Sequence, residues 1–506
     1  MRLSRVTVIF PMLLCCSVVM GQTRMDRQSS SGGSSGAAAA RNDLRSIEDV
    51  IRKLNEHSTV EGRDESKSYK ILFDAYLKLS NPPMAVGSEF NQNTIHNKMK
   101  MPRWSAVSGW AESNSAMAQA IIESRNKNII GLPYGKDEVD AAYRQAGIYI
   151  DIVRDAQLGK IDFEYFNALS TISAFATAEV YRRMEAGQVE EALELAMAHI
   201  FVLRQFCDRD FLEEKFNNIE MLSSALRNLR DVFYVYLDKI SQEQFRNIAL
   251  RQIPFLRPDR SRLFMPEADR IVSEARIRMV FDERSGRADP DLFASTFAVI
   301  QSRDEPLIRF GASKRWKIVA DVHGALPASL ERLQLIYDDW WRRWRIEEYD
   351  PILEIETEFD RCNRVRYAAV LYSMANIESL FSIRNHLIAE VNGTAMAAGL
   401  CGYHRSFEKY PRASHMIYAV SVRKRSDSDP HDYDLAPFKY RLTATRTAID
   451  TSSGRIWLEP NSALLYSRGQ NHSDDRASTH TDDGTLGDVV IWPPIKAVLR
   501  EQGVIE

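Results

Sequence analysis

Between about residues 42 and 281, apolar residues recur every three or four positions, and almost no stretch alternates apolar with polar residues. This spacing places apolar side chains on one face of an α-helix, and Asp or Ser precedes several such segments, as at helix N-caps. The pattern predicts a helical bundle or an irregular helical array. Clear examples are SIEDVIRKLNEH (46–57), SYKILFDAYLKLS (68–80) and DEVDAAYRQAGIYIDIVRDAQ (137–157).

A longer helical segment, residues 166–206, contains an apparent turn. It reads FNALSTISAFATAEVYRRMEAGQVEEALELAMAHIFVLRQF. The glycine at 187 and the acidic start Glu190-Glu191 predict an antiparallel helix pair. The pair resembles one tetratricopeptide-type unit. No 34-residue period surrounds it, so a plain helical bundle stays the alternative to an irregular array.

The segment 282–363 has a mixed pattern and is expected to connect the helical region to a further domain. Its stretch DDWWRRWRIEEYD (338–350) places Trp340 and Trp344 one helical turn apart, with arginines beside them. Such a face is typical of a packed core with a charged rim. A stacking platform for a ligand or nucleotide is the alternative.

Residues 364–506 predict a small α+β domain. Residues 364–410 favour one long helix, or two joined near Asn392-Gly393, with Pro411 as the end. Strand-like pieces separated by polar loops follow. They are MIYAVSVR (416–423), FKYRLTA (438–444), RIWLE (455–459), ALLYS (463–467) and DVVIW (488–492). The expected fold class is therefore mainly α, with this α+β domain at the C-terminus.

Length and charge narrow the class of protein. A chain of 506 residues exceeds one ordinary core, so two or three domains are expected. The formal net charge of -3 is small for this size and argues against a general nucleic-acid surface. Any charged site is therefore local.

The N-terminus has the layout of a cleaved signal peptide. Residues 1–21 contain Arg2 and Arg5, an apolar run from Val6 to Met20, and a closing glycine. The run is shorter than the about 20 residues that a spanning helix needs, and an uncleaved anchor is the alternative. Residues 22–41 are expected to be a flexible leader rich in Gly, Ser and Ala. We expect an exported protein in the periplasm, the cell envelope or the medium, with no spanning segment in the mature chain.

Three cysteines follow the predicted signal peptide, at positions 207, 362 and 401. Their odd number and wide spacing define no disulfide framework. A bridge between Cys362 and Cys401 and three buried free thiols are both compatible with export.

Four short motifs stand in order along the C-terminal part. They are Tyr403-x6-Tyr410-Pro411, Pro437-Phe438, Tyr466-Ser467-x-Gly469-x-Asn471, and an acidic stretch leading to Gly487-Asp488-Val489 and Trp492. Together they resemble the globular head of the major pseudopilin of type II secretion systems. Glu408, Ala436 and Lys439 depart from that family's glycine, aspartate and glycine, and the N-terminus lacks the pilin leader. A helix-rich region with such a tail also resembles a group of large exported bacterial proteins, a likeness that implies architecture and no activity.

The acidic stretch is a candidate calcium site. Asp474, Asp475, Asp482, Asp483 and Asp488 crowd one loop, and their like charges repel unless solvent or a cation offsets them. Calcium accepts six to eight oxygens at about 2.3–2.6 Å in flexible geometry. The pseudopilin resemblance implies calcium in the same loop, with carbonyls after Gly469. A solvated acidic loop is the alternative.

A second candidate metal site is weaker. Asp321-x-His323-Gly324 looks like the first metal-binding motif of metallophosphoesterases. Such enzymes need further clusters to hold two ions about 4 Å apart, and neither cluster follows in the sequence. A turn that leads into a helix is the alternative interpretation.

These observations favour an exported, non-catalytic envelope binding or scaffold protein with protein partners and no nucleic acid. One alternative is a secreted metal-dependent hydrolase that uses Asp321 and His323. Another is an accessory component of a secretion or pilus-like machine.

Overall fold

The computed structural model describes residues 46–57, 59–83, 104–152, 158, 161–258, 263–282, 284–304, 311–346, 349–418, 422–480 and 486–505. The predicted signal peptide and leader lie outside these ranges. Helices account for 57% of the structure and strands for 8%, with five strands in a small C-terminal region. This confirms the expectation of a mainly α chain with a small sheet region at its C-terminus.

The helices are distributed along the whole chain. In order they are α1 (Ile47–Asn55), α2 (Tyr69–Tyr76), α3 (Trp104–Ser113), α4 (Ser115–Ser124), α5 (Ala141–Gln145), α6 (Tyr165–Glu185), α7 (Val189–Phe206), α8 (Leu212–Val235), α9 (Gln242–Asn247), α10 (Ala268–Met279), α11 (Pro290–Asp304), α12 (Ala312–Val322), α13 (Leu326–Arg345), α14 (Ala368–Ser373), α15 (Glu378–Phe407) and α16 (Ile495–Glu501). Short single-turn elements are η1 (Asp64–Ser66), η3 (Lys136–Glu138), η4 (Ile248–Gln252), η5 (Ile253–Phe255), η7 (Pro351–Glu354), η8 (Ser414–Ile417) and η9 (Lys424–Asp427).

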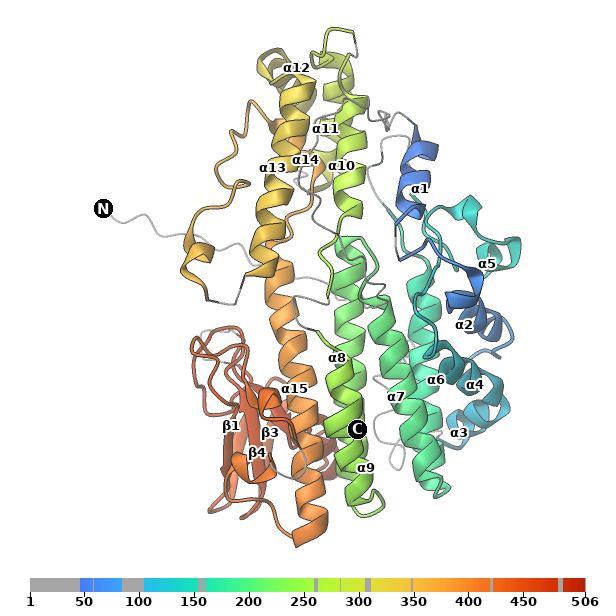
Figure 1. Ribbon diagram of the computed structural model, residues 1–506, viewed down its shortest axis with the longest axis vertical. Coiled ribbons are helices and arrows are strands. Elements are labelled where there is room, and N and C mark those ends of the chain that lie inside the picture. The colour runs from blue at the N-terminus through green and yellow to red at the C-terminus, as the bar shows by residue number, and fades with distance from the viewer. Residues whose placement is uncertain are drawn as a thin grey trace, which may run out of the picture.

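The molecule is elongated, and α8 and α15 run side by side along its long axis (Figure 1). Helices α6 and α7 lie on one side of this pair, and the strands lie on the other. Apolar side chains from α1 to β5 form one continuous buried cluster, and a smaller cluster lies among the strands and α16. In the described ranges, no helix combines the length and apolar content needed to cross a membrane.

The helix pair α6–α7 matches its sequence pattern. The turn between the two helices contains Gly187 with φ +78°, a conformation that glycine adopts without strain. Glu190 and Glu191 occupy the first turn of α7, where the helix dipole favours negative charge. The predicted helix pair is confirmed, and its tetratricopeptide-like character stays a prediction.

The segment 282–363, expected to be a mixed or helical connector, forms α11, α12 and α13 in the residues that the structure describes. Trp340 and Trp344 are buried, and Trp344 donates through Nε1 to the carbonyl of Leu263 at 2.8 Å. Arg345 stacks over the exposed ring of Trp341, with its guanidinium carbon 3.7 Å from the ring centre. The face is therefore a packed core with a charged rim, as predicted.

The structure decides between the two alternatives for residues 364–410, because no helix break lies near Asn392-Gly393. Helix α15 continues for 30 residues through this point, and the break lies between Ser373 and Glu378. Gly393 serves close packing instead, because a Cβ there would lie 2.7 Å from the Cδ1 atom of Ile491. The helix ends at Phe407, and Glu408 takes a left-handed conformation with φ 54° before the chain reaches Pro411.

The C-terminal strands form two small sheets. Strands β1 (Lys439–Leu442), β4 (Ala463–Ser467) and β5 (Val489–Trp492) pair antiparallel in the order β1-β4-β5, and β2 (Thr447–Thr451) pairs with β3 (Gly454–Leu458) as a hairpin. Four of the five predicted strands are therefore confirmed, and β2 was missed.

The fifth predicted strand, 416–423, was wrong in the residues that the structure describes. Residues Ser414–Ile417 form the single turn η8 instead. The side chains of Ile417 and Val422 are buried and pack toward Gly399 of α15. The described residues of this segment therefore pack against helix α15 and do not form a strand.

The structure decides between a Cys362–Cys401 bridge and three buried free thiols, the two alternatives that the sequence left open. Cys207, Cys362 and Cys401 are all free and buried. The bridge between Cys362 and Cys401 is therefore not formed, and burial raises the pKa of all three thiols.

Candidate functional site

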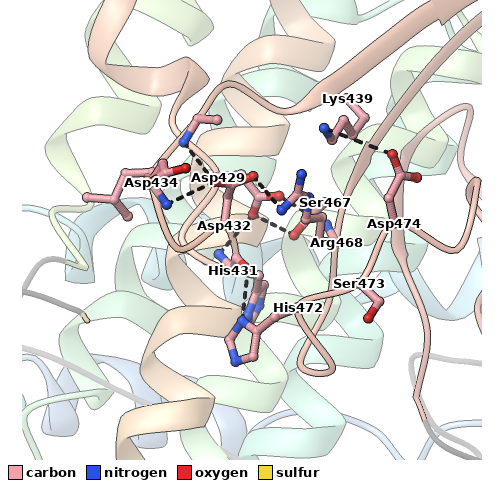
Figure 2. Close-up of polar contacts among 12 residues, drawn as sticks. Asp429, His431, Asp432, Asp434, Lys439, Ser467, Arg468, His472, Ser473 and Asp474 are labelled. Atoms are coloured by element: carbon pink, nitrogen blue, oxygen red, sulfur yellow. Dashed lines mark hydrogen bonds and ion pairs between the residues drawn. The ribbon is translucent and has the colours of Figure 1, made fainter.

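A polar cluster lies where the loop after η9 meets the end of β4 (Figure 2). Asp429 is buried at its centre and accepts three hydrogen bonds: from Ser467 Oγ at 2.7 Å, from the Arg468 N–H at 3.0 Å and from the His431 N–H at 3.0 Å. Burial raises the pKa of Asp429, although these three donors oppose the shift. This carboxyl group therefore holds two loops together.

Arg468 adds the charged contact of the cluster. Its guanidinium lies 3.0 Å from the carboxylate of Asp432, which also accepts the N–H of Asp434 at 3.0 Å. Gly469 follows with φ +68°, and a Cβ there would overlap the carbonyl oxygen of Gly487. The Ser467-x-Gly469 part of the motif around Tyr466 thus serves the junction of three chain segments.

Two histidines face each other on the same side of this cluster (Figure 2). The Nδ1 atom of His472 lies 2.9 Å from the carbonyl oxygen of His431, and its ring packs near those of Tyr433 and Tyr349, with centroid distances of 4.7 Å and 5.6 Å. Burial lowers the pKa of His431 to about 3, so this imidazole is neutral under ordinary conditions.

Sequence reasoning did not single out Asp429, His431, Asp432 or Tyr349. A usable signal was present, since SDSDPHDYD (426–434) concentrates Asp around a proline, a pattern that favours side-chain-capped turns. That pattern predicts a turn but not its partner, which comes from residues 467–472.

The candidate calcium loop is adjacent to the cluster around Asp429. Asp474 accepts from Tyr466 Oη at 3.0 Å and lies 3.9 Å from Lys439 Nζ, whereas Asp475 accepts from Asn471 Nδ2 at 2.7 Å. These two carboxylates therefore already have partners in the protein.

Asp488 differs from them. It is 2% exposed, its Oδ2 accepts the N–H of Ala477 at 2.6 Å, and its Oδ1 has no hydrogen-bond partner among the residues that the structure describes. Burial, with the charges of Asp474 and Asp475, raises the pKa of Asp488 to about 7. The structure thus brings Asp474, Asp475 and Asp488 into one electrostatic neighbourhood.

Asp482 and Asp483 lie outside the described residues. Within the described ranges, no three side chains of His, Cys, Asp or Glu gather in a way that could hold a metal ion.

The two residues of the second candidate metal site, Asp321 and His323, differ in their exposure. Asp321 is exposed on α12, whereas His323 is partly buried, with ring centroids 5.0 Å from Phe293 and 5.5 Å from Phe281. His323 Nε2 accepts the N–H of Ala369 at 3.1 Å, and Nδ1 lies 2.9 Å from the carbonyl oxygen of Gly324. Both ring nitrogens are engaged by the backbone, and burial lowers the pKa of this imidazole. His323 therefore joins α12 to α14.

The comparisons with known proteins found no match among family models, curated proteins or solved structures.

Proposed function

We propose that this chain is an exported, non-catalytic scaffold or binding protein of the bacterial cell envelope, with a pseudopilin-like tail. The observation that supports this most is the junction between the tail and the helices. Helix α15 carries the tail and packs along α8, so that the tail is built onto the helical array rather than tethered to it.

Buried charge strengthens this junction. Glu390 of α15 lies 2.7 Å from Arg230 of α8 and 3.2 Å from Arg227. Burial alone would raise the pKa of Glu390, but the two arginines lower it to about 2. Arg230 also donates to Thr394 Oγ1 at 2.7 Å. A rigid connection of this kind suits a protein that presents surfaces at a fixed spacing.

Export and partners are tested together. We expect the native N-terminus to begin near residue 22, as measured by mass spectrometry, and a chain that still begins at Met1 contradicts cleavage. A photo-crosslinking residue at position 433 of the tail, where Tyr433 is 61% exposed, and another at position 318 of α12, where Ile318 is 57% exposed, would report partners in intact cells.

Envelope proteins cross-linked at either position support the scaffold role, and secretion-machine components support the accessory alternative. The proposal is overturned if the chain stays in the cytoplasm and forms no cross-link at either position. The hydrolase alternative gains no support from the positions of Asp321 and His323, because both ring nitrogens of that imidazole are occupied.

We also propose that the acidic loop binds one calcium ion. The supporting observation is Oδ1 of Asp488, which is buried and has no partner within the described part of the chain, since leaving an ionised oxygen in that state is costly. Asp488 would bind the ion, and backbone carbonyls of the loop would supply further oxygen donors. The resemblance to pseudopilins points to the same loop. The ion would supply charge compensation and would fix the loop.

Calorimetric titration of the full chain with calcium is expected to reveal one site and a raised melting temperature. Both effects are expected to disappear in Asp488→Ala and to persist in Asp434→Ala, which removes an exposed carboxylate of the same tail. If titration gives no heat and a chelator leaves melting unchanged, the loop is a solvated surface.

A further inference from the structure

Helix α12 exposes apolar side chains on its outer face. Ile318 and Val322 lie one turn apart and are 57% and 59% exposed. The inner face is buried, and it consists of Ala312, Trp316 and Ala320. Residues four apart lie on one side of a helix, so Ile318 and Val322 form an apolar stripe directed away from the core. In a single chain this stripe faces water, which is unfavourable in proportion to its area.

The charged residues of α12 oppose the dipole of the helix. Lys314 and Arg315 lie in the first turn, Asp321 lies in the last turn, and all three are exposed. A helix carries partial positive charge at its N-terminus and partial negative charge at its C-terminus, so each side chain adds a like charge to its own end. A second helix running in the opposite direction would reverse this effect, because its C-terminus would lie beside Lys314 and its N-terminus beside Asp321.

The sequence of α12 is complementary to itself in that antiparallel orientation. With Ile318 on a two-fold axis, each Ile318 meets its counterpart, and Lys314 of one copy lies within one position of Asp321 of the second copy. At about 100° per residue, Lys314 and Asp321 lie on the same side of the apolar stripe. An antiparallel pair brings the equal sides of its two helices together, so both of these contacts join opposite charges.

The position of α12 leaves its outer face accessible. The helix packs mainly against α11, where Lys317 pairs with Asp291. It lies near one end of the elongated molecule, and the strands lie towards the other end (Figure 1). A contact through α12 therefore keeps both tails away from the interface.

We propose that α12 is a self-association surface, on which a second copy of this chain binds through its own α12 in antiparallel orientation. The interface is isologous, because each copy supplies the same apolar stripe and the same two charges. The helix has 11 residues and is about 16 Å long, so the contact is smaller than a standard interface. It gives a weak dimer, with a dissociation constant on the order of 100 µM. This pairing goes beyond the scaffold role, which a monomer also fits.

Cysteine trapping tests the pairing. The full chain carries Cys15→Ser and Cys16→Ser, and the three remaining thiols are buried. Packed helices lie about 8–10 Å apart, which brings residues on the axis within the about 4.4–6.8 Å that a disulfide needs between Cα atoms. We expect Ile318→Cys to form an intermolecular disulfide at least tenfold faster than Phe407→Cys, a control position on α15 that is 54% exposed. Equal rates at the two positions overturn the proposal.

Charge reversal tests the antiparallel register. Lys314→Asp and Asp321→Lys each place like charges across both contacts, and each is expected to slow trapping at position 318 at least threefold. Neither loss can come from a weaker helix, because each change improves the match with the dipole of α12. The double variant restores opposite charges and is expected to recover the rate to within about twofold. Unchanged single variants, or a double variant that does not recover, contradict the pairing.

Sedimentation equilibrium measures the affinity. The weight-average mass is expected to rise from the monomer towards the dimer between about 10 and 500 µM. Ile318→Asp places a charge on the axis and is expected to weaken association at least tenfold, whereas Phe407→Asp leaves it unchanged. A mass that stays monomeric, or a dimer that Ile318→Asp leaves intact, overturns the proposal.

The photo-crosslinking residue at position 318 separates this proposal from the scaffold role in intact cells. We expect it to join two copies of this chain. Capture of a different protein alone would assign α12 to another partner and overturn the pairing, while it would still support the scaffold role. Cross-links at position 433 test the scaffold role without involving α12.

Discussion

Arg209 and Glu214 form a buried ion pair at the start of α8, with 2.8 Å between Arg209 Nε and Glu214 Oε1. The same carboxylate accepts from the hydroxyls of Tyr134 at 2.9 Å and Tyr165 at 2.8 Å. One carboxylate thus connects the loop after α4, the start of α6 and the turn between α7 and α8. The carboxylate also accepts the N–H of Phe211 at 3.3 Å, and these four contacts make it a polar centre inside an otherwise apolar core.

Replacing Glu214 is expected to destabilise the fold strongly. Glu214→Gln leaves the Arg209 guanidinium buried without its carboxylate, and breaking a buried pair in this way costs about 3–5 kcal/mol. The free energy of unfolding from urea titration measures the loss. The control is Glu243→Gln, whose exposed carboxylate pairs with Arg246 at 3.6 Å and is expected to change stability by less than about 0.5 kcal/mol. Equal losses in the two variants contradict the role of the buried pair.

The Glu390 contacts predict an acid-dependent loss of stability. Because the folded-state pKa of Glu390 is about 2, below its ordinary value of 4.5, its contribution is fully present above about pH 4.5. That contribution is lost as the pH falls toward 2, and it amounts to about 3 kcal/mol. Urea titrations at pH 7, 5 and 3 are expected to give a steeper decline for the wild type than for Glu390→Gln. Parallel declines would show that Glu390 does not carry the effect.

Asp321 and His323 are expected to respond differently to substitution. His323→Ala removes an imidazole from an aromatic cluster and leaves the Ala369 N–H without its acceptor, so a loss of about 2–3 kcal/mol is expected. Asp321→Ala alters an exposed carboxylate and is expected to stay within about 0.5 kcal/mol.

Metal analysis and phosphoester hydrolysis complete this comparison. We expect no transition metal and no hydrolysis that depends on either residue. Stoichiometric metal that is lost in both variants, together with hydrolysis, would restore the hydrolase hypothesis.

Gly393 and Gly109 form a matched pair of helical glycines. Gly393→Ala places a methyl group 2.7 Å from Ile491 Cδ1, and overpacking of this kind costs about 1–3 kcal/mol. A Cβ at Gly109 of α3 meets no atom within 4 Å, and Gly109→Ala is expected to stabilise by up to about 1 kcal/mol. The melting temperature of each variant shows whether the substitution stabilises or destabilises the protein. Stabilisation of both variants would mean that α15 and β5 are not in close contact.

The sequence predicted those features that depend on local pattern. Periodicity predicted the α6–α7 pair, and short strand-like pieces separated by polar loops predicted β1, β3, β4 and β5. Strand β2 was missed because its sequence, TAIDT, is short and half polar, and only the pairing with β3 makes it a strand.

Long-range contacts explain the remaining errors. Nothing local to Gly393 indicates that Ile491, almost one hundred positions later, needs the space of a missing side chain. Similarly, the cluster around Asp429 depends on Ser467 and Arg468, which a local reading of 426–434 does not bring together.

Helix α15 has a mechanical consequence. Because this helix belongs to the tail and also lies along α8, a force applied to the C-terminal strands loads the α8–α15 contact in shear along its length. Many side-chain contacts then resist sliding at the same time. If a flexible linker joined the tail to the helices, that linker would first extend without resistance. The Arg230–Glu390 pair resists sliding of α15 along α8, and the Gly393–Ile491 contact holds β5 against α15.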